Sequence, residues 1–188
     1  YMIGVMKEGN AMNTEEQLRL VKKAIKGDPD AYGQLIAEHQ EYLYKMAYLY
    51  VRNEDAALDV VGTVMLNAYQ GIRSLKEPQY FKTWITRILI RTAQNELKKM
   101  VYYSELDNIS LPDRYAGVTL EEKCDLNSAI EQLSEKYRTV IYLKYFSGFT
   151  IKEIAFAMDA PEGSVKAYLS RAREELKRIL KEDYLYAN

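Results

Sequence analysis

The sequence predicts an all-α protein with two helical domains joined by a flexible linker, the second a four-helix domain that contains a helix-turn-helix. Apolar residues recur at helical spacing along most of the 188 residues, and no segment alternates as a strand would. The periodicity is lost over residues 101–124, which we expect to be the linker. Residues 150–180 have the pattern of a helix, a turn and a longer helix. We therefore divide the chain into residues 12–100 and residues 125–188, with residues 1–11 as a tag or disordered tail.

The leading domain should open with two helices separated by a turn that proline marks. Thr14 fits the first position of a capping box, and its helix should end near Gly27. Asp28 then suits an N-cap, with Pro29 at the first helical position. The apolar repeat predicts that this second helix is long and ends near Val51.

The next helix, expected from Asn53 to about Ser74, is apolar on more than one side. A helix of this kind is either central in a core or covered by a partner. Gly62 stands in its middle at a cost of about 1 kcal/mol relative to alanine, and the sequence gives no reason for it. The apolar residues that spread around this helix are Val60, Val61, Val64, Met65, Leu66, Ala68 and Ile72.

A loop over residues 74–80 precedes a helix over residues 81–100, and this helix combines an aromatic ring with cations on one narrow arc. A ring can stack on an unpaired base, which is worth about 1–3 kcal/mol per base, while the cations hold the backbone. The alternative is that the tryptophan belongs to the core and the arginines only solvate the helix. The residues of this arc are Trp84, Arg87, Arg91 and Lys98.

The linker is acidic, whereas the helix before it is basic. Residues 82–99 hold five bases and one acid, and residues 102–135 hold eight acids and two bases. This acidity argues against DNA contact within the linker. Two further helices, over residues 120–133 and 135–146, should lead into the helix-turn-helix.

In the helix-turn-helix, Thr150 and Glu153 fit a capping box, and residues 159–161 interrupt the first helix. The second helix should bury a stripe from Val165 to Leu176. Its opposite face combines small residues with flanking cations, which lets a helix approach a DNA duplex and contact its phosphates. The alternative is a helical hairpin with a solvated charged face. The outward side chains are Lys166, Ser170, Arg171, Arg173 and Lys177.

The composition excludes several classes of function. The net charge is −1, so any nucleic-acid surface must be local. Cys124 is the only cysteine and His39 the only histidine, and His39 falls in an apolar series that favours a packed role over a catalytic one. No catalytic triad, metal-ligand spacing or glycine-rich phosphate loop is present. We expect no enzyme activity, no cofactor and no small-molecule substrate. With no secretory or membrane-spanning stretch, we expect a cytoplasmic protein.

Several motifs, taken in order, resemble one family. The leading domain holds NEDAALDVV and then YFKTWITRILI, and the trailing domain holds LSEKYRTVIYLKYFSGFTIKEIAFAM and PEGSVKAYLSRAREELK. With an acidic linker between them, these motifs resemble the extracytoplasmic-function (group 4) sigma factors, the promoter-specificity subunits of bacterial RNA polymerase. The resemblance covers nearly everything from Met12 onward.

The resemblance implies three surfaces and three partners. The partners are core RNA polymerase, promoter DNA as duplex and as melted strand, and an anti-sigma factor that is often membrane-anchored and would hold the chain at the inner face of the membrane. Polymerase would be bound by Asp55, Leu58, Asp59, Gly62 and Met65. The minus-ten strand would be captured and held by Lys76, Glu77, Gln79, Lys82, Thr83, Trp84, Arg87 and Arg91. The minus-thirty-five duplex would be read by Ser164, Lys166, Ser170, Arg171 and Arg173.

The chain also departs from the family pattern. Gly62 stands where members commonly have Gln, Arg91 where many have Asn, and Asn95 where many have Asp. These changes imply a weaker polymerase contact and a minus-ten contact that favours charge over base readout. The alternative function is a free-standing helix-turn-helix repressor or activator, which should bind duplex DNA tightly on its own. That reading leaves the tryptophan arc and the two-sided helix unexplained.

Overall fold

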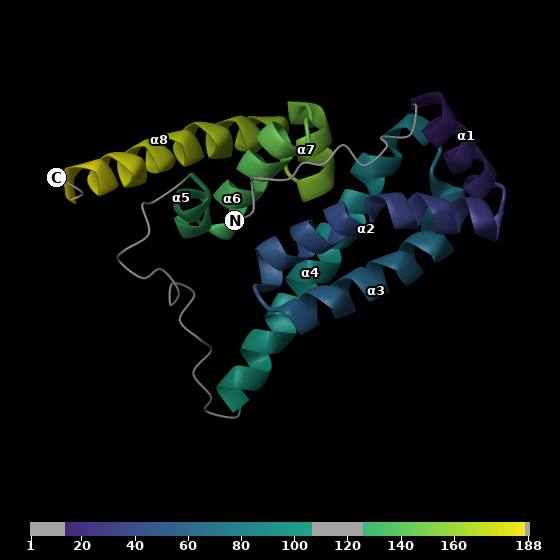
Figure 1. The fold of residues 1–188 in the computed structure, drawn as a ribbon, viewed down its shortest axis with the longest axis horizontal. Coiled ribbons are helices and arrows are strands. Elements are labelled where there is room, and N and C mark those ends of the chain that lie inside the picture. Colours follow the sequence, from purple (N-terminus) through teal and green to yellow (C-terminus); the bar gives the residue numbers. More distant parts are fainter. Residues whose placement is uncertain (1–13, 107–125, 187–188) are drawn as a thin grey trace.

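The structure, a computed structural model, describes residues 14–106 and 126–186 as helices joined by short turns (Figure 1). The first part of the chain forms α1 (Thr14–Ile25), α2 (Pro29–Val51), α3 (Glu54–Gly71), the 3-10 turns η1 (Ile72–Ser74) and η2 (Pro78–Tyr80), and α4 (Phe81–Leu106). The second part forms α5 (Leu126–Gln132), α6 (Glu135–Ile141), the π-helical segment η3 (Tyr142–Phe146), α7 (Ile151–Met158) and α8 (Glu162–Tyr186). The expected all-α architecture with two domains is confirmed. The tail and most of the linker lie outside the described residues, and the domain boundaries stay predictions.

Local sequence explains where the helices of the leading domain begin. Asp28 Oδ1 accepts hydrogen bonds from the backbone N–H groups of Asp30 and Ala31, at 3.1 and 3.0 Å. Asn53 Oδ1 accepts one from the N–H of Ala56 at 2.9 Å. Both expected N-caps are confirmed, and each supplies partners for N–H groups that a helix start leaves open.

The core of the leading domain surrounds α2, which packs against α1, α3 and α4. His39 is buried in this core, where its Nδ1 donates to the carbonyl of Leu35 at 2.8 Å and its ring meets Phe81 edge-on at 5.3 Å. Burial lowers the pKa of His39, so a neutral, packed imidazole is favoured, as the sequence predicts. The fully buried residues of this core include Val21, Leu35, Leu43, Met46, Val60, Val64, Ile85 and Leu89.

Several helix boundaries differ from the expected ones; α3, for example, ends at Gly71 and is followed by η1 up to Ser74. The first helix ends at Ile25, just before Gly27, whose φ of +97° closes the turn. The helix expected to end at Met100 continues to Leu106, because residues 101–106 contain no glycine or proline to stop it. Part of the helix expected over residues 120–133 is described, as α5, and its first six residues lie outside the described residues.

The trailing domain is built on the predicted capping box. The backbone N–H of Glu153 donates to Thr150 Oγ1 at 3.2 Å, and the N–H of Thr150 donates to Glu153 Oε2 at 2.9 Å. Helix α7 ends at Asp159, whose φ of +53° turns the chain toward α8. The buried residues between α6, α7 and α8 include Val140, Leu143, Ile154, Val165, Leu169 and Ala172.

The two domains are in contact, with α7 against α4 and α6 against α2. The hydroxyl groups of Thr139 and Tyr50 form a buried hydrogen bond of 3.0 Å between them. The structure is therefore closed, and the contact decides which candidate functional surfaces meet solvent.

Candidate nucleic-acid interface

The outward face of α8 is open to solvent. Val165, Leu169 and Ala172 are buried beneath it and fix the rotation of the helix. Arg173 Nε donates to the carbonyl of Leu169 at 3.2 Å, so one guanidinium is oriented along the helix. The predicted duplex contacts all lie on this helix, with Ser164 half-buried and Lys166, Ser170, Arg171 and Arg173 exposed.

The loop before α4 is anchored on one side and open on the other. Leu75 is buried, and Ser74 Oγ donates to the carbonyl of Gly71 at 2.7 Å. The predicted capture residues Lys76, Glu77 and Gln79 are exposed, and Gln79 Nε2 donates to Glu77 Oε2 at 3.0 Å. The loop thus offers polar side chains on a fixed backbone, as a pocket for an unpaired base requires.

Trp84 is partly packed against the core and partly open to solvent. It is half-buried, 6.1 Å from Phe81 between ring centroids, and its Cζ2 would lie 3.3 Å from a Cβ added to Gly71. The indole therefore packs on the end of α3 and keeps only part of its surface for stacking.

Lys82 and Thr83, at the start of α4, face the trailing domain. Lys82 Nζ donates to the carbonyl of Ser147 at 3.2 Å and lies over the rings of Tyr42 and Phe149, at 5.1 and 5.5 Å. Thr83 Oγ1 donates to Glu153 Oε1 at 3.3 Å. Burial lowers the pKa of Lys82, and the nearby Glu153 carboxylate partly offsets this. For Glu153 burial alone would raise the pKa, but hydrogen bonds from Thr150 and Thr83 outweigh it and lower the pKa.

Arg87 and Arg91, one and two turns further along α4, share a single carboxylate. Arg87 Nη2 lies 2.6 Å from Asp159 Oδ1, and Arg91 Nη2 lies 3.0 Å from Asp159 Oδ2. The guanidinium of Arg87 also lies over the ring of Phe156, 4.5 Å from its centroid. The hydrogen bond from Arg91 and the charge of Arg87 hold the pKa of Asp159 below its usual range.

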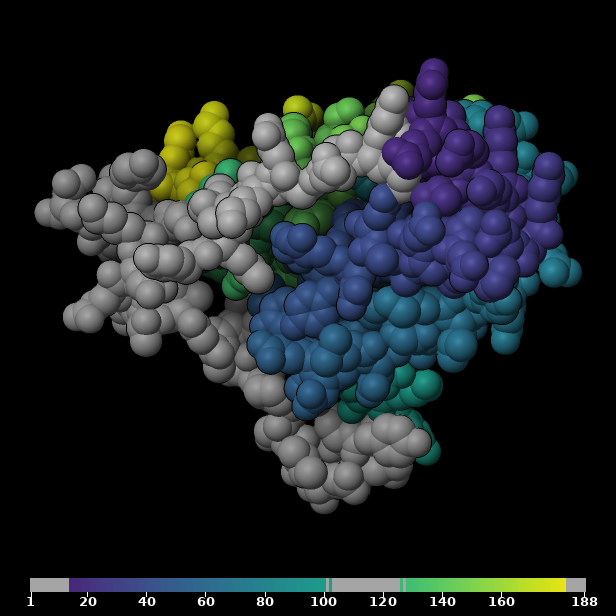
Figure 2. All heavy atoms as spheres, turned by 45° about the vertical axis from the view of Figure 1, so that its right-hand side comes forward, coloured from purple at the N-terminus to yellow at the C-terminus, as the bar shows by residue number. Residues whose placement is uncertain are grey.

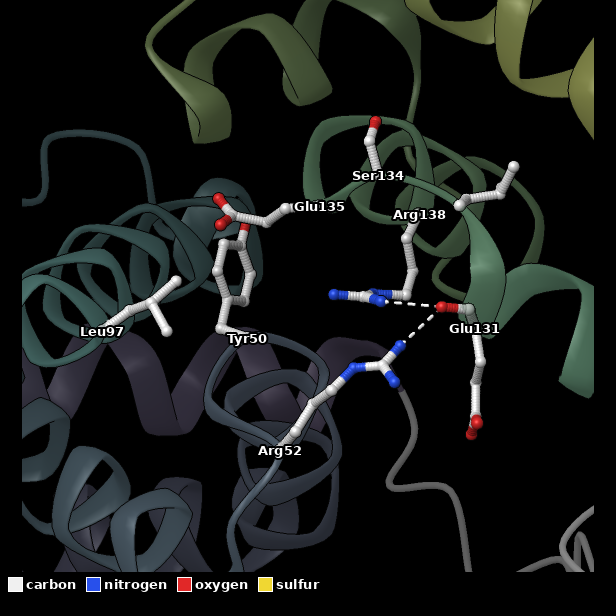
Figure 3. Close-up of a pocket in the computed structure, with 8 residues that line it drawn as sticks. Tyr50, Arg52, Leu97, Glu131, Ser134, Glu135 and Arg138 are labelled. Atoms are coloured by element: carbon white, nitrogen blue, oxygen red, sulfur yellow. Dashed lines mark hydrogen bonds between the residues drawn. The ribbon is translucent and has the colours of Figure 1, made fainter. Parts of the chain in front are cut away.

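A second part of the domain contact lies beside a small cavity of about 70 Å³ (Figure 3). Arg52, whose φ is +50°, and Arg138 both donate to the backbone carbonyl of Glu131, at 2.7 and 3.2 Å. Gln94 Nε2 donates to Glu135 Oε1 at 3.4 Å. Burial, with the charge of Arg52 next in size, lowers the pKa of Arg138 to about 10, which leaves it charged at neutral pH.

The sequence did not predict that Glu153 and Asp159 contact the other domain. Asp159 was read only as part of a turn, and Glu153 only as part of a cap. The sequence did contain a signal for this contact, because the helix-turn-helix holds these two carboxylates and the helix of the other domain holds several cations. Which carboxylate meets which cation depends on the fold and could not be read from spacing.

A third surface, formed by α2 and α3, is apolar and uncovered; Figure 2 shows these helices on an open face of the molecule. Leu58, Leu66 and Tyr69 are 58%, 66% and 51% exposed. Gly62 lies between the first two, one turn from each, and nothing lies within 4 Å of a Cβ added there. Of the predicted polymerase contacts, Asp55, Leu58, Asp59 and Gly62 are exposed and Met65 is half-buried. A hollow of about 380 Å³ beside this surface is lined by Ala37, Gln40, Glu41, Tyr44, Leu58 and Val61.

Within residues 14–106 and 126–186, no group of three or more His, Cys, Asp or Glu side chains could hold a metal ion. In the same part of the chain, none of the helices is both long and apolar enough to cross a membrane.

An open helix-turn-helix face on one domain and an aromatic–cationic helix on the other are typical of a DNA-binding protein. Comparison with known families gives the particular class. Residues 35–100 match the model for Sigma-70 region 2, and residues 125–176 match the model for Sigma-70, region 4.

Whole-chain relatives agree with the family models. The chain is 31% identical over 150 residues to RNA polymerase sigma factor SigV of Bacillus subtilis, a match covering 79% of this chain and 90% of SigV. It is 30% identical over 173 residues to the ECF RNA polymerase sigma-E factor of Escherichia coli K12, covering 84% and 90%. The chain belongs to the extracytoplasmic-function family of bacterial sigma factors and is a promoter-specificity subunit of RNA polymerase. The fold also matches that of the sigma factor RpoE of Bartonella quintana, solved with the anti-sigma factor NepR, with a TM-score of 0.66 and 24% identity over 80% of this chain and 96% of that one.

Proposed function

We propose that the chain divides its work among the three surfaces described above. The apolar surface of α2 and α3 docks on core polymerase, α8 reads the minus-thirty-five duplex, and the loop at residues 74–80 with α4 captures the melted minus-ten strand. The chain supplies binding energy and no bond chemistry, in keeping with a family of DNA-recognition subunits. The observation that carries the proposal is the exposed stripe of Leu58, Leu66 and Tyr69, which a free-standing DNA-binding regulator does not need.

The predicted polymerase contact on α3 suits a partner helix that lies along it. Leu58, Gly62 and Leu66 follow one another at intervals of four residues, so they form one line on the helix surface. Because Gly62 has no side chain, this line has a dent in the middle where the backbone of a partner can approach closely. The dent gives a role to a glycine that sequence reasoning left unexplained.

An anti-sigma factor is the second protein partner that we propose. The similar fold of RpoE was solved with NepR, and a protein that covers α3 or α8 of this chain would block polymerase or duplex binding. The apolar stripe on α3 gives such a partner a surface to bind.

The test is a pulldown and run-off transcription assay with purified bacterial core polymerase. Stable association and transcripts that depend on the promoter are expected. Tight duplex binding by the chain alone, without association with polymerase, would instead favour a repressor.

The strand-binding role of α4 has its own test. The holoenzyme carrying Trp84→Ala should reach the promoter as wild type does, yet show weaker permanganate reactivity of promoter thymines, because a base loses its stacking surface. Because Trp84 packs on Gly71, thermal unfolding of the variant is measured as a control for loss of stability. Wild-type permanganate reactivity in a folded variant would reject the assignment.

A further inference from the structure

The two proposed DNA-binding surfaces differ in their contacts with the rest of the chain. Four of the five predicted strand contacts on α4, all except Trp84, contact the trailing domain in the structure. Lys82 meets Ser147, Thr83 meets Glu153, and Arg87 and Arg91 meet Asp159. We refer to these seven residues as the α4–α7 contact. In contrast, none of the predicted duplex contacts on α8 is buried.

The partners in this contact are chemically similar to a DNA backbone. Asp159 places one carboxylate oxygen on each of two guanidinium groups, as the two free oxygens of a phosphate would lie. Glu153 adds a second negative charge beside Thr83 and near Lys82. A melted strand would need the same donors, so the strand and α7 cannot both occupy them.

Lys82 and Arg87 are held by more than charge. Lys82 lies between Tyr42 of the leading domain and Phe149 of the trailing domain, and Arg87 lies over Phe156. Cation–π contacts of this kind add a modest attraction to the ion pairs, which a strand held by several cations can exceed.

Asp159 occupies its position because of the fold. It caps α7 in the left-handed region, where Asp and Asn are tolerated better than most residues. The same turn joins the two helices of the helix-turn-helix. One residue therefore shapes the duplex-reading unit and also engages the strand-binding helix.

We propose that the helix-turn-helix is a selective intramolecular inhibitor: Glu153 and Asp159 stand in for strand phosphates and occupy Thr83, Arg87 and Arg91 of α4, while α8 stays free to bind duplex DNA. The proposal rests on the strand-binding role of α4. The masking implies an order of binding. A closed chain would bind duplex DNA first, and single-stranded DNA only after the α4–α7 contact opens.

The test uses the full chain without polymerase and the variant Asp159→Asn. Asparagine keeps the left-handed turn and removes the charge that pairs with Arg87 and Arg91. The probes are a fluorescein-labelled single strand of mixed sequence and its duplex, measured by fluorescence anisotropy. We expect the variant to bind the single strand about threefold to tenfold more tightly, because two exposed ion pairs no longer compete, with duplex affinity unchanged.

The matched control is Asp30→Asn, the same chemical change at an exposed residue at the start of α2. If both variants gain equally on both probes, the effect is long-range charge and the proposal is overturned. It is also overturned if Asp159→Asn gains nothing on the single strand.

A second measurement follows the contact itself. Spin labels at Lys22→Cys on α1 and Lys177→Cys on α8, in a Cys124→Ser background, report the distance between the domains. Asp159→Asn should shift the distribution toward longer distances, and an unchanged distribution would contradict the proposal.

Failure of this inference is distinguishable from failure of the proposed function. If Arg87→Ala with Arg91→Ala abolishes promoter melting by the holoenzyme but Asp159→Asn changes neither probe, α4 binds the strand and the masking is wrong. If the double variant melts promoters as wild type does, the strand-binding role of α4 is wrong.

Discussion

Helices α4 and α8 are both long and both carry cations on one side, yet the predicted DNA contacts of α4 pair with the trailing domain, while those of α8 lie on an open face. On α4 the side chain of Arg87 is 24% exposed and shares a carboxylate with Arg91, whereas on α8 Arg171 and Arg173 are exposed. The difference does not come from the helices themselves, since either pattern suits nucleic acid. It comes from the turn at Asp159, which faces α4 and leads away from the outer face of α8. The charge pattern thus indicates what a helix can bind, whereas the domain contact determines whether its cations are available for binding.

The exposed side of this comparison is tested by Arg171→Ala with Arg173→Ala. Loss of two contacts to bases or phosphates should cost about 1–3 kcal/mol each, so holoenzyme affinity for a minus-thirty-five duplex should fall at least about thirtyfold. Lys22→Ala with Lys23→Ala on α1 is the control for a general loss of charge. Unchanged promoter binding by the first variant would remove α8 from the duplex groove.

The uncovered surface of α3 extends the comparison to a protein partner. Leu58→Glu should weaken polymerase binding about tenfold, as loss of an interface anchor does, and change the free energy of unfolding by less than about 0.5 kcal/mol. Met65→Glu is the contrast, because that half-buried side chain packs on the core and should lose about 1–3 kcal/mol of stability. A pulldown and urea unfolding measure the two effects. A large stability loss for Leu58→Glu would mean that it is a core residue.

Two glycines of α3 test, with smaller expected effects on stability, which side of this helix is open and which is packed. Gly62→Ala should raise the free energy of unfolding by about 0.5–1 kcal/mol, because the new methyl group enters open space and the helix gains propensity. Gly71→Ala should gain less or lose, because its Cβ would meet Trp84 at 3.3 Å. Urea unfolding of both variants gives the comparison, and equal gains would contradict the packing of Trp84.

The covered side responds to acid. The ordinary pKa of Asp159 is 3.8, and the hydrogen bond from Arg91 and the charge of Arg87 lower it in the closed chain. A lowered carboxyl pKa stabilises the closed state fully above the ordinary value and loses that effect as the pH falls through the lowered one. The Asp159 part of the domain contact should therefore be independent of pH near neutrality and weaken only below 3.8. Carboxyl NMR titration of Asp159 in wild type and Arg91→Ala checks this, and identical midpoints would exclude the pairing.

Most of the fold followed from local signals in the sequence. The caps at Asp28 and Asn53 and the capping box at Thr150 satisfy N–H groups within four residues, so a sequence window contains all that they need. The buried stripes followed from periodicity for the same reason. The length of α4 did not, because the loss of apolar periodicity from residue 101 predicts a helix end at Met100, although nothing in residues 101–106 stops a helix.

The placement of the candidate sites was only partly readable. The outward face of α8 could be predicted because the buried stripe of the same helix fixes its rotation. The state of Arg87, Arg91 and Lys82 could not, because their partners lie 65 to 72 residues away along the chain. The partial burial of Trp84 could not be predicted either, because its neighbour Gly71 belongs to a different helix, α3.

The apolar stripe of Leu58, Leu66 and Tyr69 has a consequence for the free protein in solution. With no polymerase present, water contacts this stripe, and a second copy of the chain offers it a mutually hydrophobic surface. Chain made in excess over polymerase will therefore tend to self-associate as its concentration rises. We therefore expect the free subunit to be less soluble than the subunit in which a partner covers this stripe.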